Sequence, residues 1–273
     1  MKILKLDPTM VKSVKDLKNF VFHEFKVDDE KGSFVHFMTP MEEQEVKARL
    51  EEDPNIPNWH YYLNQYGFRG KWDLNSLPKI GVYGCSCTFG VGTDWPYIYS
   101  SRLQDYYGKD KVEILNFGLP GASIQRIAKI VSATLRLFDI KIAIITLPSE
   151  TRSLLLNEEL KLIDLVPNHF YGFIKEKAER LYQVYDDNNL IIIALDYINW
   201  IRSELTAKNV TMFFTTWNTH TYFEILKEVI PKHQLLPLWN YWPSNSFGRD
   251  KSHPGIDAHR SLYEMIIKRI PNV

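Results

Sequence analysis

Short apolar runs alternate with longer amphipathic stretches through the last two thirds of the chain. The run 141–147 is almost unbroken, as expected for a strand of a parallel sheet that is covered on both faces. The runs span residues 80–83, 112–116, 141–147, 210–215 and 233–238, the last as a candidate short strand. We therefore expect a central parallel sheet of about five strands.

The stretches between these runs have the periodicity of helices. Ile124, Ile127 and Ile130, for example, are three positions apart and lie on one face of a helix. Similar patterns predict helices over 95–107, 122–138, 170–185, 188–206 and 256–270. The alternation of strands and helices indicates an α/β fold with right-handed crossovers.

Residues 1–58 follow a different pattern. Residues 10–25 have apolar positions near the helical period, and residues 42–52 are polar and helix-favouring. The breaker cluster 53–58 marks the best domain boundary. We interpret 1–58 as a helical N-terminal extension that packs on the main domain, 59–273, or on another subunit. The extension is therefore the candidate surface for a homo-oligomer or a larger assembly.

Length and charge narrow the class of protein. A chain of 273 residues can form one large α/β domain with an added segment. Lys+Arg and Asp+Glu both number 33, so no basic excess favours nucleic acid or an anionic membrane as a partner. No stretch approaches the roughly 18 apolar residues of a membrane span, and the N-terminus lacks the pattern of a signal peptide. We expect a soluble, cytoplasmic protein.

The candidate chemistry begins where the first predicted strand ends. Ser86 follows Gly84 directly after the run 80–83, and Gly90 and Gly92 make a turn before the next helix. Open α/β sheets build their sites at the carboxyl ends of the strands. Ser86 is therefore a candidate nucleophile, although most serines after a strand only form local hydrogen bonds.

The chain's two cysteines, Cys85 and Cys87, flank this serine. Only two positions apart, they can close only a strained ring, so we do not expect a disulfide between them. We interpret both as small buried residues beside the site. A cysteine nucleophile is the alternative to Ser86, because a neighbouring histidine activates a thiol.

A carboxylate and an imidazole occur together near the other end of the chain. Asp250 and His253 are three positions apart, just before the predicted C-terminal helix. On a helical turn this spacing places both side chains on one face. The carboxylate can then orient the imidazole, and the imidazole can accept the proton of a serine hydroxyl.

Three short blocks of residues thus follow one another along the chain. They are Gly84-Cys85-Ser86, Asn116-Phe117-Gly118-Leu119-Pro120-Gly121 and Asp250-Lys251-Ser252-His253-Pro254. In content and order the blocks resemble the SGNH (GDSL-type) hydrolase superfamily. The resemblance implies a flavodoxin-like three-layer α/β/α sandwich that works through a Ser-His-Asp triad and needs no cofactor.

The resemblance also assigns a role to each block. Ser86 corresponds to the nucleophile, His253 to its general base and Asp250 to the carboxylate that orients the base. The backbone N–H groups of Ser86 and Gly121 correspond to donors of the oxyanion hole. The sequence has no set of histidines, cysteines or carboxylates at metal-ligand spacing, so we expect no metal site.

Two positions depart from the pattern of the superfamily. Cys85 stands where an aspartate is usual. Ser149 stands where the superfamily has an asparagine that donates to the oxyanion hole. Either Ser149 takes that role, or Asn218 after the fourth strand does, or the hole has fewer donors.

Four further side chains are candidates for substrate binding: Arg69, Arg152, Trp217 and Asn218. The planar fork of Arg69 can bind an acidic group of the substrate or brace a buried carboxylate. Arg152 can contact an anionic group of the substrate. Aromatic residues that either stack on a sugar ring or pack in the core follow the fourth strand: Trp217, Trp239, Tyr241 and Trp242.

The sequence therefore predicts a serine esterase. We expect it to remove an acyl group, acetyl in the first place, from a carbohydrate or another small ester. An O-acyltransferase would use the same triad. The alternative from another class is an inactive binding or structural protein with this fold, because a fold alone does not guarantee activity.

Overall fold

The computed structural model describes residues 8–13, 16–17, 33–35, 61–156, 162–165, 182, 187–217, 220–240, 246–250, 252–270 and 272. At its centre lies a four-stranded parallel sheet with the order β4-β3-β5-β8. The strands are β3 (Lys79–Gly84), β4 (Glu113–Gly118), β5 (Ile140–Leu147) and β8 (Thr211–Thr216). The predicted α/β fold with a central parallel sheet is confirmed.

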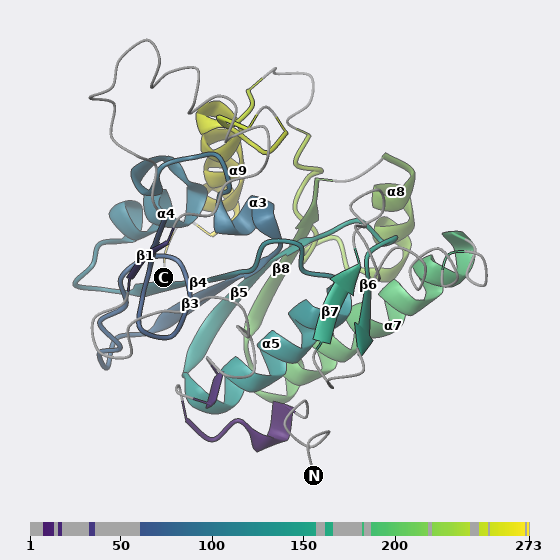
Figure 1. Cartoon of the computed structure of the whole chain (residues 1–273), viewed down its shortest axis with the longest axis horizontal. Helices are drawn as coiled ribbons and strands as arrows, with labels where there is room; N and C mark the ends of the chain where they lie inside the picture. Colours follow the sequence, from purple (N-terminus) through teal and green to yellow (C-terminus); the bar gives the residue numbers. More distant parts are fainter. Residues whose placement is uncertain are drawn as a thin grey trace.

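Helices cover both faces of this sheet (Figure 1). On one face lie α5 (Ile124–Leu137) and α7 (Asp187–Ala207), which pack against each other. On the other face lie α4 (Tyr99–Tyr107) and α9 (Ile256–Arg269), which also pack against each other. The result is the predicted three-layer arrangement.

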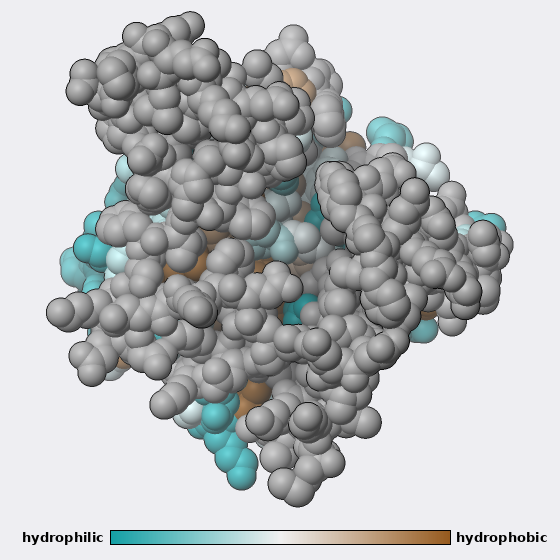
Figure 2. Space-filling view, viewed as in Figure 1, coloured by the Kyte–Doolittle hydropathy of each residue, from teal (hydrophilic) through white to brown (hydrophobic). Residues whose placement is uncertain are grey.

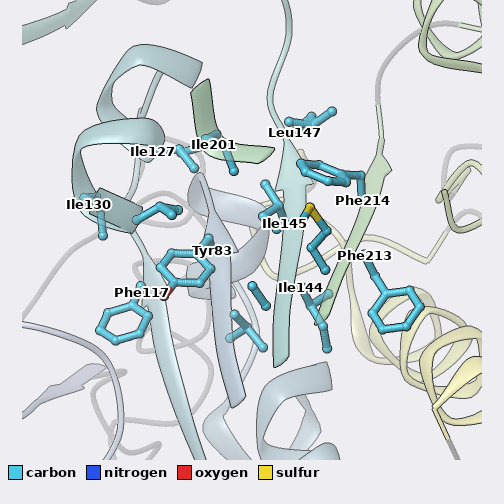
Figure 3. Close-up of a cluster of buried hydrophobic side chains, with 14 of the residues drawn as sticks. Tyr83, Phe117, Ile127, Ile130, Ile144, Ile145, Leu147, Ile201, Phe213 and Phe214 are labelled. Carbon is cyan, nitrogen blue, oxygen red and sulfur yellow. The ribbon is translucent and has the colours of Figure 1, made fainter. Parts of the chain in front are cut away.

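The strands are apolar because both of their faces are covered. Successive side chains of a strand point to opposite faces, so aligned residues of neighbouring strands form rows across the sheet. One row consists of Phe117, Tyr83, Ile145 and Phe214. Figure 3 shows Tyr83 and Phe117 on the side of the sheet that faces Ile127 of α5. The Tyr83 hydroxyl adds a hydrogen bond of 2.9 Å to Thr134 of that helix.

Short elements connect this framework at the carboxyl end of the sheet. They are α3 (Ser86–Phe89), the 3-10 helix η3 (Trp95–Tyr97), α8 (His220–Val229) and the antiparallel pair β6 (Ser153–Leu156) and β7 (Leu162–Leu165). The pattern of the sequence did not predict α8, β6 or β7. Short apolar runs such as those of β6 and β7 do not distinguish a strand from part of a helix.

The predicted fifth strand at 233–238 is reduced to a single parallel bridge beside β8. The Phe214 N–H donates to the Gln234 carbonyl, and the Leu236 N–H donates to the Phe214 carbonyl. The segment follows a turn that begins at Pro231, which leaves only a short stretch alongside the sheet. Its contribution is therefore to close the edge of the sheet at β8.

The described residues of the predicted N-terminal extension contain a strand, β1 (Ser33–Val35), besides the 3-10 helix η2 (Pro8–Met10). The strand pairs antiparallel with β2 (Tyr61–Leu63), so this part of 1–58 is not helical. Val11 and Leu17 are buried in the main core, which places these residues on the main domain. The rest of the predicted helices at 10–25 and 42–52, and most of 170–185, lie outside the described residues.

Among the described residues on the face shown in Figure 2, hydrophilic ones lie mainly along the outline of the molecule. In the part of the chain that the structure describes, no helix combines the length and the hydropathy needed to cross a membrane.

Replacing Ile145 by alanine tests the core row of the sheet. Ile145 is fully buried, so the substitution leaves a cavity and should lower the free energy of unfolding by about 3 kcal/mol. Lys141 is the matched control, because it lies in the same strand with an exposed side chain. Lys141→Ala should change the free energy of unfolding by less than about 0.5 kcal/mol. Urea denaturation measures both; equal losses would contradict this account of the core.

Candidate active site

Ser86 lies on a tight turn between β3 and α3, at the carboxyl end of the sheet. Cys85, the single residue between Gly84 and Ser86, has extended backbone angles, and Ser86 is the first residue of the helix. A Cβ atom on Gly84 would lie 2.1 Å from the Thr88 hydroxyl, so only glycine allows this close approach. Gly90 ends the helix in the left-handed conformation, and its N–H donates to the Ser86 carbonyl over 2.9 Å.

The structure brings Ser86, His253 and Asp250 together from opposite ends of the chain. His253 Nε2 lies 2.9 Å from Ser86 Oγ. On the other side of the ring, His253 Nδ1 is hydrogen-bonded to Asp250 Oδ2. The imidazole therefore joins the hydroxyl to the carboxylate, which is the arrangement that activates a serine for nucleophilic attack.

Asp250 is fully buried and its carboxylate accepts several hydrogen bonds. Besides the imidazole, the Ser252 hydroxyl donates to Oδ2 over 2.8 Å, and the His253 N–H donates to Oδ1 over 3.1 Å. Burial raises the pKa of Asp250, but the hydrogen bonds and charge of His253 outweigh it, and the pKa falls to about 2. The carboxylate therefore stays ionised and holds the imidazole in one orientation.

A contact between two loops places Asp250 and His253 beside Ser86. The Arg249 N–H donates to the Gly92 carbonyl over 2.9 Å, and the Thr93 hydroxyl donates to the Pro254 carbonyl over 3.0 Å. Gly92 has a φ of 75°, and a Cβ atom there would lie 2.8 Å from Asp250 Oδ1. Loop 90–94, directly after α3, thus forms the surface on which loop 248–254 rests.

Arg69 supports loop 90–94 by holding backbone carbonyls of this loop and of the residue before it. It is buried, and its guanidinium donates to the carbonyls of Phe89, Gly90 and Thr93. The guanidinium also lies over the ring of Tyr61, whose hydroxyl accepts a hydrogen bond of 2.8 Å from the Gly92 N–H. Among the described residues, Arg69 therefore holds backbone carbonyls, a role beyond the two predicted for it. Its partners only become adjacent once the turn after α3 has formed.

The second block of the sequence lies beside Ser86 because β4 is the neighbour of β3. The buried Asn116 amide donates to the Thr88 carbonyl and to the Ser100 hydroxyl, both over 2.9 Å. A Cβ atom on Gly118 would lie 2.3 Å from the Phe89 nitrogen, so the helix rests directly on this glycine. The Asn116 amide thus fixes α3 against the end of β4.

Gly121 follows at the same edge of the sheet. The Leu119 N–H donates to the Gly84 carbonyl, and the Ala122 N–H donates back to the Leu119 carbonyl, which closes a turn through Pro120. Gly121 has a φ of 79°, a conformation that favours glycine. Within the described residues, the backbone N–H groups of Ser86 and Gly121 make no hydrogen bond.

The other predicted binding residues have different surroundings. The Ser149 hydroxyl, after β5, is hydrogen-bonded to the Thr151 hydroxyl over 2.7 Å. Arg152 is buried, with its guanidinium 5.4 Å from the ring centre of Trp217, the residue after β8. Asn218 lies outside the described residues.

Trp239 is not part of an aromatic surface for a sugar. It is fully buried, and its indole N–H donates to the Ala258 carbonyl of α9 over 2.9 Å. The packing interpretation therefore holds for this residue. Tyr241 and Trp242 lie outside the described residues.

Neither cysteine forms a disulfide, and both are buried, as predicted. A hydrogen bond from Cys87 lowers the pKa of the Cys85 thiol well below its usual value, against the effect of burial, and the charge of Arg152 contributes. The imidazole nonetheless contacts the hydroxyl of Ser86, whose Oγ lies 3.9 Å from Cys85 Sγ. The geometry therefore favours Ser86 over the cysteines as the nucleophile.

A cavity elsewhere among the described residues is separate from this site. A cavity of about 790 Å³ between α8 and α9 is lined by residues such as Phe223, Lys227 and Met265, and by none of the three triad residues. Within the described part of the chain, no group of three histidines, cysteines or carboxylates could hold a metal ion.

Comparisons with known proteins find similarity in structure alone. No protein-family model matches the chain, and the search of curated proteins finds no match. Among solved structures, the chain is similar to a member of the lipolytic G-D-S-L family from Veillonella parvula, with 13% identity and a TM-score of 0.47. That match covers 71% of this chain and 99% of the other.

Two further solved structures are esterases. The chain is similar to the psychrotrophic esterase EstA from Pseudoalteromonas sp., with 13% identity, a TM-score of 0.46, and 71% and 96% of the two chains covered. It is also similar to a catalytic mutant of Axe2, an acetylxylan esterase from Geobacillus stearothermophilus. There the identity is 16%, the TM-score 0.42, and the coverage 74% and 98%. At such distances, the chemistry has to be inferred from the side chains of this chain.

Replacing Gly92 by alanine tests the contact between the two loops. The added methyl group meets the Asp250 carboxylate, so we expect reaction of Ser86 with a fluorophosphonate to slow at least about tenfold. Gly108→Ala is the matched control, because Gly108 also has a positive φ but faces only the flexible Asp110 side chain. Both variants should lose roughly 1–3 kcal/mol of stability from backbone strain. Equal rates of labelling in the two variants would contradict this role of Gly92.

The low pKa of Asp250 predicts a pH-dependent contribution to stability. The folded pKa of about 2 lies below the ordinary value of 3.8, so ionisation stabilises the fold. This contribution, on the order of 2 kcal/mol, is complete above about pH 5 and is lost progressively as the pH falls to about 2 and below. In chemical denaturation, the stability difference between wild type and Asp250→Asn should shrink as the pH falls from 5 to 3. A difference that stays constant over this range would show that Asp250 has an ordinary pKa.

Proposed function

We propose that this chain is a serine esterase of the SGNH type. The observation that carries the proposal is the line from Ser86 Oγ through the His253 ring to the buried Asp250 carboxylate, with 2.9 Å between hydroxyl and imidazole. The Asp250 carboxylate holds His253 Nδ1, and the Ser86 hydroxyl lies at His253 Nε2, so Nε2 is the nitrogen that accepts the serine proton. A structural histidine would not need both partners in this order.

In the first half of the reaction, Ser86 Oγ attacks the carbonyl carbon of the ester while His253 Nε2 takes the hydroxyl proton. Asp250 stabilises the imidazolium that forms, since its carboxylate remains ionised. The carbon–oxygen bond of the ester then breaks, and the imidazolium gives its proton to the departing alcohol. In the second half, His253 takes a proton from water as the water oxygen attacks the acyl carbon. The bond between that carbon and Ser86 Oγ then breaks, and the imidazolium returns its proton to Ser86 Oγ.

The negative charge on the carbonyl oxygen needs donors beside Ser86. We propose that the unpaired N–H groups of Ser86 and Gly121 supply them, since the parallel pairing of β3 and β4 brings both turns to one edge of the sheet. One such donor typically accounts for about 3 kcal/mol of transition-state stabilisation. Ser149 can join if its hydroxyl accepts the hydrogen bond from Thr151, which leaves its own proton for the oxyanion.

We propose an acetyl ester of a carbohydrate, or another small ester, as the substrate. The Axe2 structure comes from an acetylxylan esterase, and acetyl transfer to or from a sugar hydroxyl uses the chemistry described above. Transfer to a second hydroxyl in place of water would make the chain an O-acyltransferase. Product analysis with and without an added alcohol acceptor separates the two reactions.

Replacing Ser86 by alanine removes the nucleophile. We expect kcat for 4-nitrophenyl acetate to fall by roughly 10³-fold or more, with little change in folding, and His253→Ala to have a similar effect. Ser132→Ala is the matched control, because Ser132 is an equally buried serine in α5 that contacts Glu204 and not the triad. A fluorophosphonate should label wild type and Ser132→Ala but not Ser86→Ala.

The inactive alternative predicts another result. If wild type neither hydrolyses the acetate, butyrate and acetyl-sugar esters nor reacts with the fluorophosphonate, the proposal of an esterase is wrong. The fold would then serve a binding or structural role.

A further inference from the structure

Arg152 is a buried cation at the carboxyl end of the sheet. It follows β5, and only 9% of its surface is exposed. Its guanidinium lies over the ring of Trp217, which follows β8. Because β5 and β8 pair with Leu147 opposite Thr216, the two side chains meet at the same edge of the sheet as Ser86. Their position there follows from the parallel topology.

Two donors of this pair lack an acceptor. Arg152 Nη1 and Trp217 Nε1 are both buried, and neither has a hydrogen-bond partner. Among the described residues, no carboxylate forms an ion pair with Arg152. A cation that is withdrawn from water without a partner costs several kcal/mol, so such groups are normally paired.

The two donors lie near Cys85, the residue directly before the proposed nucleophile. The charge of Arg152 and the N–H of Trp217 both act on the Cys85 thiol, and Cys85 Sγ is 3.9 Å from Ser86 Oγ. Cys85 does not satisfy them, however, because Arg152 Nη1 and Trp217 Nε1 make no hydrogen bond of normal geometry with its sulfur. An acceptor from outside the chain can therefore still bind between the guanidinium and the indole N–H.

We propose that Arg152 and the Trp217 N–H bind an anionic group of the substrate, a carboxylate in the first place, beside the ester bond that Ser86 attacks. The planar fork of arginine matches the two oxygens of a carboxylate, and the indole adds a third donor. The inference rests on the proposed esterase function and specifies its substrate class: esters that carry a negative charge on the acyl group or on the alcohol.

A charge present before the reaction explains this arrangement better than the oxyanion alone. The oxyanion exists only transiently, whereas Arg152 is buried in the resting protein. A bound carboxylate would neutralise the guanidinium for as long as the substrate occupies the site. The arginine is then a binding residue that selects substrates, while His253 and Ser86 carry out the bond changes.

Two pairs of substrates test this selection. Mono-4-nitrophenyl glutarate and 4-nitrophenyl valerate have acyl groups of equal length and differ in a terminal carboxylate. Acetylated glucuronic acid and acetylated glucose make the same comparison on the alcohol side. The quantity measured is the ratio of kcat/KM for the anionic member to that for the neutral member of each pair.

For Arg152→Gln, we expect this ratio to fall roughly 10- to 100-fold in at least one pair, mainly through KM, while kcat/KM for the neutral ester stays within a few-fold. Arg152→Lys keeps the charge without the fork and should lie between wild type and Arg152→Gln. Trp217→Phe keeps the ring without the N–H and should lower the ratio a few-fold. Lys141→Gln, which removes one exposed positive charge near the opposite end of β5, should leave the ratio unchanged.

The proposal is overturned if the ratio in Arg152→Gln equals that of wild type for both pairs. If thermal unfolding shows that Arg152→Gln does not fold, the ratio in Arg152→Lys decides in the same way. Titration calorimetry with glutarate and glucuronate separates this proposal from the esterase proposal. Binding to wild type that is lost in the Arg152 variant supports the anion site even when no ester is hydrolysed. No binding of either anion, together with no anionic substrate turned over, rules the site out.

Discussion

The contact between loop 90–94 and loop 248–254 is the constraint on which the whole site depends. The serine follows strand β3, and the acid–base pair lies in the segment before the last helix, so nothing local joins them. Gly92 leaves just enough space for the Asp250 carboxylate, and the backbone of Arg249 is hydrogen-bonded to the Gly92 carbonyl. Arg69 in turn holds the first loop by three backbone carbonyls. A site of this kind is rigid because its two halves are supported independently and then joined.

Two buried charges lie close to the serine, and the structure treats them differently. The carboxylate of Asp250 is saturated by donors from Ser252 and His253, which is why its pKa lies so low. The guanidinium of Arg152 has an aromatic face beneath it and a donor without an acceptor. The saturated charge is suited to orient a neighbouring group permanently. The unsaturated one is suited to a partner that comes and goes, and a substrate is such a partner.

Several residues show how much of the site the local sequence pattern can predict. Ser86, Asp250 and His253 were predicted because their chemistry is tied to short motifs beside a strand end or a helix start. The backbone carbonyls that Arg69 holds were not predicted, since a guanidinium offers only donors and any acceptor can satisfy them. The sequence left open whether Trp239 lies on the surface or in the core. It lies in the core, because α9 packs over it and the Ala258 carbonyl of that helix accepts its N–H.

Hydrophobic periodicity and three short blocks were enough to determine the α/β class, the parallel strands of the sheet, its two helical layers and the residues of the candidate triad. These features follow from local preferences and from the apolar character of strands that are covered on both faces. The tertiary structure alone decided which loop supports which, that Asn116 and Arg69 brace the turn after Ser86, and that Arg152 meets Trp217. Those contacts join residues from 20 to more than 100 positions apart, so they exist only after the strands have paired in their final order.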